Sequence, residues 1–154
     1  MLKTIVLISA VIAFIYPLEG SWAFLAIASL LEGYLLLLSW RKPSDTFGQN
    51  IQLTDKEKQL IDQYSLYFTR PHAARSLSTT MSLIALVGVV LFLWFLYQQL
   101  WLQAILVFGN YFLSQNLSAK LNIRFYLHDA VEIQHKEEYR EKMELVDSVC
   151  KKIT

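Results

Sequence analysis

One acidic residue lies in the middle of the most apolar stretch of the chain. Glu32 is one residue past the midpoint of the 19-residue run 22–40, WAFLAIASLLEGYLLLLSW, whose only other non-apolar residues are Ser29, Gly33 and Ser39. A helix rises about 1.5 Å per residue, so a helix over this run would match the roughly 30 Å hydrocarbon core of a bilayer. A carboxylate at that depth costs on the order of a few kcal/mol unless another polar group compensates for it. Glu32 is therefore the first candidate for a functional residue.

The partner expected for Glu32 is Asn110, which lies near the midpoint of another apolar run, 100–117. Acids inside a membrane usually face the interior of a helix bundle, pair with another polar group, and often mark a proton or cation path. A neutral Glu32 hydrogen-bonded to Asn110 would instead hold two helices together. We predict an intramembrane polar pair of Glu32 and Asn110. We favour a structural role, or a contact with a partner protein, over transport.

A second group of side chains, which could bind a metal ion, lies toward the C-terminal end. His128, Glu132 and His135 follow one another at i, i+4 and i+7 and would share one face of a helix. A Glu-x-x-His pair is one half of what a carboxylate-bridged two-metal site requires. The sequence lacks the second half, and His72 has no acid at ligand spacing. These three residues are weak candidates for metal ligands, and we predict a solvated helical face and no cofactor.

The common motifs of enzymes are missing from the sequence. It has no nucleophile elbow, glycine-rich phosphate loop, His-Glu-x-x-His motif or Cys-x-x-Cys motif. The lone cysteine, Cys150, has no intrachain partner for a disulfide. Arg41, Lys42, Arg70 and Arg75 flank the apolar runs, where basic side chains often hold lipid phosphates. We predict headgroup contacts for these four residues and favour a protein without enzymatic activity.

The segregation of charge predicts the class of the protein. Of the 154 residues, 55% are hydrophobic, and no Asp, Glu, Lys or Arg occurs from residue 77 to residue 119. A soluble protein spreads its charges along amphipathic elements, whereas here nearly all of them lie in segments 41–76 and 120–154. The net charge of +1 gives no basic surplus for binding nucleic acid. The composition therefore predicts an all-α membrane protein that contacts lipids and has no nucleic-acid partner.

Four apolar runs are candidates for membrane spans: 2–18, 22–40, 77–97 and 100–117. Pro17, Glu19 and Gly20 supply a tight turn between the first two runs. The turn between the last two, around Gln98 and Gln99, contains no glycine, proline or asparagine. A single helix over 77–117 would nevertheless be about 60 Å long, twice the thickness of the hydrocarbon core. We therefore predict four transmembrane helices, arranged as two helical hairpins.

The charged segments are expected to form helices outside the membrane. Thr54 and Glu57 have the spacing of a capping box, and the helix that they open is expected to run over 55–69. Its apolar side is predicted to be a docking face formed by Leu60, Ile61, Tyr64, Tyr67 and Phe68. Beyond residue 117 we expect an uninterrupted helix to residue 154, with an apolar seam of Tyr139, Met143, Val146, Cys150 and Ile153. The docking face is predicted to pack on this seam or on the membrane surface.

The positions of lysine and arginine predict the orientation in the membrane. Lys3 lies at the very start of the first run, the other 13 lie between the second and third runs or after the fourth, and the two remaining turns have none. Segments rich in lysine and arginine stay in the cytoplasm, so both termini are predicted to be cytoplasmic, in a chain integral to the inner membrane. The chain then divides into a first hairpin (1–40), a cytoplasmic loop with the amphipathic helix (41–76), a second hairpin (77–117) and a cytoplasmic C-terminal helix (118–154).

Three classes of function remain open. The first is a small accessory protein of the inner membrane (a subunit, assembly factor or immunity protein) that acts by binding a protein partner or as a homo-oligomer. We favour it because few residues could line a reaction site, while two helical faces are available for docking. The second is a proton- or cation-coupled transporter that uses Glu32 and, with only four spans per chain, needs an oligomer. The third, a membrane enzyme, rests only on Arg70, His72 and Arg75 and on the histidine group.

Overall fold

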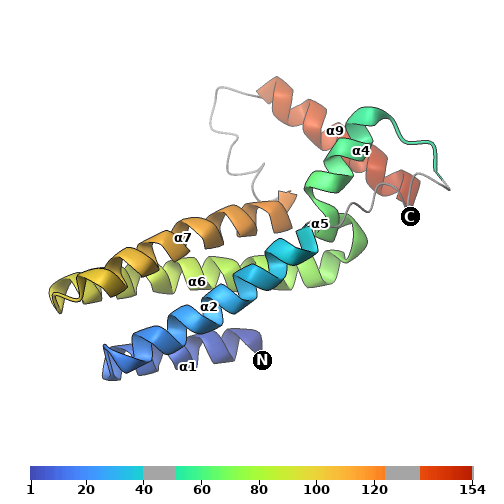
Figure 1. The fold of residues 1–154 in the computed structure, drawn as a ribbon. Helices are drawn as coiled ribbons and strands as arrows, with labels where there is room; N and C mark the ends of the chain where they lie inside the picture. Colours follow the sequence, from blue (N-terminus) through green and yellow to red (C-terminus); the bar gives the residue numbers. More distant parts are fainter. Residues whose placement is uncertain (40–50, 124–135, 154) are drawn as a thin grey trace. The chain divides into compact units, whose positions relative to one another are not determined.

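The computed structural model describes residues 1–39, 51–123 and 136–153, and within these residues all regular secondary structure is helical. The all-α class predicted from the sequence is therefore confirmed for this part of the chain. Its helices are α1 (Leu2–Ile15), α2 (Glu19–Ser39), α4 (Asp55–Gln63), α5 (Ser65–Thr69), α6 (Pro71–Tyr97), α7 (Trp101–Leu121) and α9 (Lys136–Ile153), as Figure 1 shows. The chain forms two compact units. Unit 1 comprises Met1–Leu36 and Ser76–Ser118, and unit 2 comprises Leu37–Arg75 and Ala119–Thr154.

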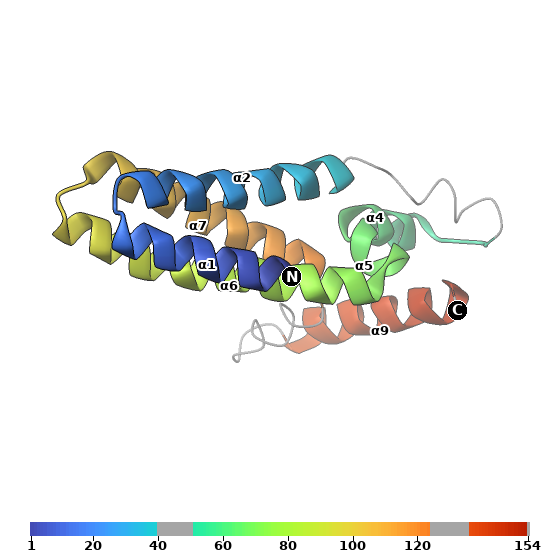
Figure 2. The same ribbon diagram turned by 90° about the horizontal axis from the view of Figure 1, so that it is seen from below.

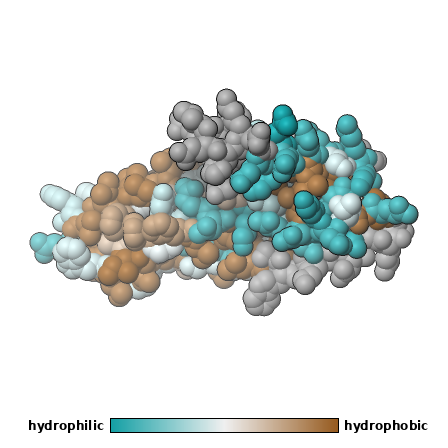
Figure 3. Space-filling model, turned by 90° about the horizontal axis from the view of Figure 1, so that it is seen from above, coloured by the Kyte–Doolittle hydropathy of each residue, from teal (hydrophilic) through white to brown (hydrophobic). Residues whose placement is uncertain are grey.

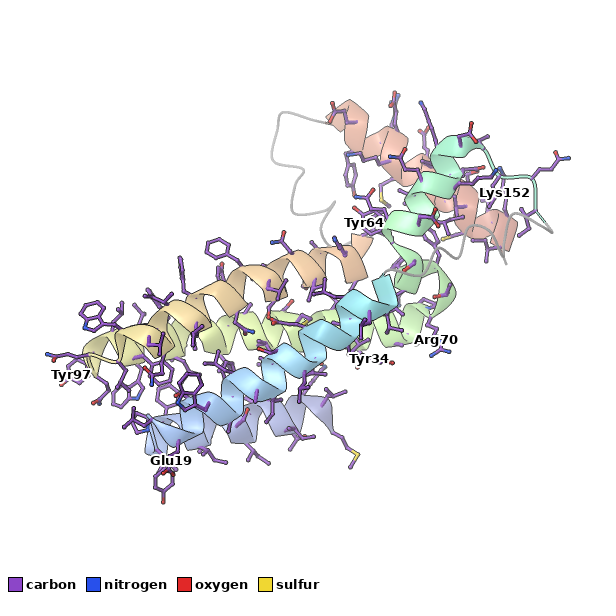
Figure 4. All side chains as sticks on the ribbon, viewed as in Figure 1. Glu19, Tyr34, Tyr64, Arg70, Tyr97 and Lys152 are labelled. Carbon is purple, nitrogen blue, oxygen red and sulfur yellow. The ribbon has the colours of Figure 1, made fainter. Side chains whose placement is uncertain are left out.

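Unit 1 consists of two helical hairpins, α1–α2 and α6–α7. Their turns lie at the same end of the unit, where Glu19 and Tyr97 are labelled in Figure 4 (see also Figure 2). Ile15 and Leu18 of one turn and Gln98 and Leu100 of the other line a common hollow at that end. The aromatic rings of Phe14 and Trp94 also meet, with their centroids 5.7 Å apart, and so join the two hairpins. The two hairpins expected from the sequence are thus present as packed helices.

Gln99 makes the turn between α6 and α7 without a glycine. Its φ angle is 59°, which puts it in the left-handed region that glycine or asparagine usually occupies at the end of a helix. The backbone N–H of Gln99 donates to the carbonyl of Leu96 at 3.1 Å, and that of Leu100 donates to the carbonyl of Phe95 at 2.9 Å. These two bonds form a Schellman motif, which satisfies the last carbonyl groups of α6. The sequence gives no local signal for it, because glutamine is not a typical residue at this position.

Gly20 lets α1 and α2 approach closely at their turn. A Cβ atom at this position would collide with the backbone of α1, at the carbonyl of Ile12 and at the Cα of Ala13, from which it would be only 2.7 Å away. The φ angle of Gly20 is not positive, since no glycine among the described residues has a positive φ. The glycine is therefore required by the packing of the hairpin and not by the conformation of a turn.

Two helices in the described residues are long and apolar enough to cross a membrane, judged by length and composition alone. They are Glu19–Leu38, with a mean hydropathy of 1.8, and Pro71–Tyr97, with 2.3. Helix α1 has only 14 residues and ends at Ile15, earlier than the expected run to residue 18. Helix α7 has the length, at 21 residues, but polar residues interrupt its apolar character. Of the four apolar helices expected to cross the membrane, two among the described residues meet this criterion.

Unit 2 differs from the sequence prediction in how its helices are divided. The helix expected over 55–69 breaks at Tyr64, whose φ and ψ of −119° and 41° are not helical, and so forms α4 and α5. The capping box of Thr54 and Glu57 is present at the start of α4. The third apolar helix begins at Pro71, six residues before the expected start at residue 77. Arg70 remains outside both helices, as the residue before a proline usually does.

The C-terminal part also departs from the prediction. Helix α7 ends at Leu121 and Asn122 is not helical, so the uninterrupted helix expected beyond residue 117 is wrong at this point. Helix α9 carries the expected apolar seam. Its buried core with the preceding helices consists of Leu60, Ile61, Tyr67, Phe68, Ile123, Val146 and Val149. The docking face predicted on 55–69 is therefore covered within unit 2 by the chain's own C-terminal helix.

Candidate functional site

Glu32 accepts two short hydrogen bonds inside unit 1. Its side chain is on α2 and the residue is only 2% exposed. The Nδ2 of Asn110 donates to one carboxyl oxygen at 2.7 Å, and the hydroxyl of Ser114 donates to the other at 2.6 Å. Asn110 and Ser114 are four residues apart on α7 and so lie on the same face of that helix. One helix therefore supplies a donor to each oxygen of an acid on its neighbour.

The contact between Glu32 and Asn110 is the one expected from their similar depth in two apolar runs. Ser114 was not expected, although its i, i+4 spacing from Asn110 was a usable signal. The geometry fits either protonation state of Glu32, because the amide of an asparagine can be turned over. An ionised Glu32 accepts from the amide nitrogen, and a neutral one donates to the amide oxygen. The site is thus a fixed polar bridge between α2 and α7.

The Asn110 amide is only partly satisfied by this bridge. The residue is 8% exposed, and its Oδ1 is buried without a hydrogen-bond partner in the described part of the chain. A buried amide oxygen without a donor costs about 1–3 kcal/mol. Turning the amide over leaves its nitrogen in the same position, so one polar atom of Asn110 stays unpaired in either orientation.

A groove of about 560 Å³ runs along the outside of this bridge between α2 and α7. Ala26, Ser29 and Glu32 line it from α2, and Gly109 and Asn110 line it from α7. The rest of its lining is apolar, from Trp22, Leu25, Ile105, Leu106 and Leu113. The polar bridge therefore forms part of the wall of a largely apolar groove on the surface of unit 1.

A second polar contact joins α6 to α7 in unit 1. The hydroxyl of Ser118 lies 2.9 Å from that of Ser82 and 3.2 Å from that of Ser78. It also contacts the backbone carbonyl of Ser78 at 3.2 Å. Ser78 and Ser118 are buried between the two helices. Both α2 and α6 are thus joined to α7 by hydrogen bonds between polar side chains.

Unit 2 contains a partly buried ion pair that the sequence did not predict. Glu57, 3% exposed on α4, accepts from the Nζ of Lys152 on α9 at 2.7 Å and 2.8 Å to its two oxygens. The hydroxyl of Ser148 adds a third bond at 3.0 Å, and the backbone N–H of Thr54 a fourth at 2.8 Å. The ammonium of Lys152, labelled in Figure 4, together with the Thr54 and Ser148 donors, lowers the pKa of Glu57 to about 2 despite its burial. Glu57 thereby ties α4 to α9.

The remaining predicted site residues fall into two groups. Arg70 and Arg75 are exposed, Arg70 at the end of α5 and Arg75 near the start of α6. Arg41, Lys42 and the weak metal candidates His128, Glu132 and His135 lie outside the described residues. Within the described residues, no group of three or more His, Cys, Asp or Glu side chains is placed to hold a metal ion.

Comparison with known proteins does not assign the chain to a family. No family model matches the chain, and no curated protein and no solved structure shows a significant match to it. The function is therefore argued from the chain's own residues.

Proposed function

We propose that the chain is a small integral protein of the inner membrane that acts by protein–protein interaction. One observation carries the proposal: unit 1 is apolar on its outside, and several polar side chains are buried among the apolar ones inside it. Large hydrophobic side chains are exposed on all four of its helices, among them Ile8, Leu30, Leu86, Leu93 and Ile105. Its buried residues include Ser9, Glu32, Gln103, Asn110 and Ser114. On the face drawn in Figure 3, apolar residues gather over the unit 1 helices. Such a surface is stable in lipid and not in water.

The same pattern supports four membrane crossings. The exposed side of α7 is apolar over most of the helix, with Ile105, Phe108 and Phe112, while Gln103, Asn110 and Ser114 are buried. The exposed polar residues Gln115 and Asn116 lie near the end of the helix. The mean hydropathy of α7 includes its buried polar residues, so it underestimates how apolar the exposed side of this helix is. Helix α1, about 21 Å long by its 14 residues, is short but exposes mostly apolar side chains, and it approaches α2 closely at their turn. Short spans are accommodated by local thinning of the bilayer.

The orientation follows from the positive-inside rule. The turns at residues 16–18 and 98–100 contain no lysine or arginine, whereas unit 2 contains most of the chain's basic residues. Unit 2 and both termini are thus placed in the cytoplasm. The exposed Arg70 and Arg75, near the start of α6, are proposed to contact lipid phosphates there.

Binding is preferred over transport because Glu32 is fully engaged inside the chain. Both of its oxygens have donors on α7, so its polar atoms join two helices of one unit. The alternative is a proton- or cation-coupled transporter that works as an oligomer. One observation favours that alternative: Glu32 lines a groove that opens to the surface of unit 1. The two functions differ in whether Glu32 must lose a proton.

The topology is tested by cysteine labelling in a Cys150→Ser background. Glu19→Cys and Gln98→Cys, at exposed turn residues, should react in intact cells with a reagent that cannot cross the membrane. Lys142→Cys, on the exposed side of α9, should react only after the cells are opened. Labelling of Lys142→Cys in sealed cells would contradict the proposed orientation.

The interaction is tested with photo-crosslinking side chains at exposed positions in living cells. Leu30 on α2 and Lys142 on α9 are suitable positions. We expect cross-linked products of discrete mass that contain a protein in addition to the labelled chain, or a second copy of it. Lipid adducts alone at both positions, together with an inactive but well-folded Glu32→Gln variant, would replace the binding proposal by the transport one.

A further inference from the structure

The docking face of α4 and α5 is covered by a helix that holds it mainly with its C-terminal half. Helix α9 lies against α4 and α5 in Figures 1 and 2, and its Val146 and Val149 are fully buried in the core that they share. From residue 138 to residue 145, by contrast, α9 has no buried residue. The cover of the docking face therefore depends on few apolar side chains of α9.

The same contact is closed at its edge by the ion pair of Glu57 and Lys152. Glu57 is 3% exposed, whereas the side chain of Lys152 is 36% exposed and can be reached by ions from outside. An ion pair in such a position adds little stability compared with apolar side chains of the same volume, but the loss of one partner leaves the other charge buried and unpaired. Another anion that takes Lys152 would therefore loosen the hold of α9 on α4.

The docking face has the composition of a helical face that lies on a membrane. It combines aliphatic side chains with the aromatic rings of Tyr64, Tyr67 and Phe68, and such rings favour the interface of a bilayer. Helix α5 ends one residue before α6 begins, and α6 is a helix that we place in the membrane. The junction between them carries the exposed cations Arg70 and Arg75, and residues 63–75 contain no acid. The face is thus attached directly to a segment suited to a membrane surface.

We propose that α9 is an autoinhibitory cover, and that the docking face binds an anionic membrane surface when lipid phosphates take Lys152 from Glu57. The apolar side chains of the face are shielded from water in both states, by α9 in one and by the headgroup–acyl boundary in the other. Anionic lipids attract basic residues, and Lys151 and Lys152 are both exposed in the last turn of α9. The attachment to α6 favours lipid over a protein as the second partner of the face. This inference rests on the membrane placement and orientation proposed above.

The test measures contact of segment 55–69 with lipid in the full chain. A phospholipid with a photoactivatable diazirine on its acyl chain labels residues that enter the bilayer, and peptide mass mapping locates them. Vesicles of phosphatidylcholine alone are compared with vesicles that contain an equal part of phosphatidylglycerol. We expect the labelling of wild-type 55–69 to be about fivefold higher in the anionic vesicles, the attraction of one basic residue to such a surface. Equal labelling in the two compositions would overturn the proposal.

A matched pair of variants tests the role of the ion pair. Lys152→Met removes the cation from Glu57, whereas Lys151→Met removes the same charge from an exposed neighbour. In phosphatidylcholine alone we expect Lys152→Met to raise the labelling of 55–69 about tenfold, the loss of one charge-assisted hydrogen bond, and Lys151→Met to leave it unchanged. The amides of α4 should stay protected from hydrogen exchange in Lys152→Met, because the helix moves to lipid without unfolding. Fast exchange of these amides would show that unit 2 unfolds instead, and this result would contradict the proposal.

The outcomes separate this inference from the proposed function. A chain that resists carbonate extraction but shows no labelling of 55–69 in Lys152→Met is a membrane protein whose docking face does not meet lipid, and the inference fails alone. Cross-links of this segment to another protein in place of lipid would assign the face to a protein partner and also overturn the inference. A chain that carbonate releases is not integral to the membrane, and the proposed function fails with it.

Discussion

The two units of the chain expose opposite kinds of side chains. Unit 2 has an ordinary interior, in which Ile61, Val146 and Val149 are buried and the charges of α4 and α9 lie mostly outside. Unit 1 exposes large apolar side chains on every helix and joins α7 to its neighbours by bonds to Glu32 and Ser118. The difference supports the proposal that unit 1 lies in lipid and unit 2 in water. In water the interior is held by apolar burial, whereas in lipid, packing and hydrogen bonds between helices replace it.

The largest expected effect comes from a charge placed in the interior of unit 2. Ile61 is fully buried between α4 and α9, so Ile61→Asp should destabilise unit 2 by about 4 kcal/mol or more. Limited proteolysis should then cut α9 readily while unit 1 stays intact. Ile61→Val, which removes one methylene, should cost about 1 kcal/mol and leave the digestion pattern unchanged. If Ile61→Asp were as resistant as the wild type, α9 would not be held by this core.

A charge on the exposed surface of unit 1 tests whether this surface faces lipid. Leu86 is 65% exposed near the middle of α6, a position where aspartate would be almost neutral in a soluble protein. In a membrane the same substitution should cost about 3 kcal/mol and lower the fraction of chain that integrates. Carbonate extraction of Leu86→Asp measures that fraction. The matched control is Lys142→Asp on the exposed side of α9, which should change nothing. Full integration of Leu86→Asp would count against a lipid-facing α6.

The ion pair of unit 2 predicts that the stability of this unit depends on pH. The pKa of Glu57 is lowered from 4.5 to about 2 in the folded chain, so its contribution to stability is complete above pH 4.5 and is lost as the pH falls toward 2. Because Lys152 is 36% exposed, we expect only about 1–2 kcal/mol from the pair. Hydrogen exchange of α9 should accelerate over this pH range in the wild type. In Glu57→Gln it should already be fast at pH 7 and should lack this component of the acceleration.

The two candidate sites also differ in how far the sequence could predict them. Glu32 and Asn110 could be paired because each lies near the middle of an apolar run, and a fixed rise per residue turns sequence position into depth. No such measure relates Glu57 to Lys152, which are 95 residues apart in charged segments. Their pairing depends on how α9 packs on α4, and this follows from tertiary contacts alone. The sequence predicts only the part of this site that is formed by residues close in the chain, namely the capping box of Thr54 and Glu57.

The sequence predicts which segments are helical, but it does not predict every helix boundary. The apolar runs placed most helices correctly, because such signals act within a few residues. The break at Tyr64, the end of α7 at Leu121 and the left-handed Gln99 have no such signal in the residues concerned. In each case a residue takes an irregular conformation that its type does not predict. Packing overrides intrinsic propensity at such positions.

The smallest expected effect separates a structural bridge from a transport site at Glu32. Glu32→Leu removes two interhelical hydrogen bonds in unit 1 and leaves Asn110 and Ser114 without their acceptor. Such bonds average about 0.6 kcal/mol each in membranes, so the loss should be on the order of 1 kcal/mol, measured by unfolding in detergent. Glu32→Gln keeps the shape and can still accept from Ser114, and its amide nitrogen can donate to the Asn110 oxygen once that amide turns over. We therefore expect Glu32→Gln to be close to the wild type in stability and in cellular activity. A glutamine variant that folds and accumulates normally but has lost its activity would show that the proton of Glu32 is required, and a bridge that only joins two helices does not need to release one.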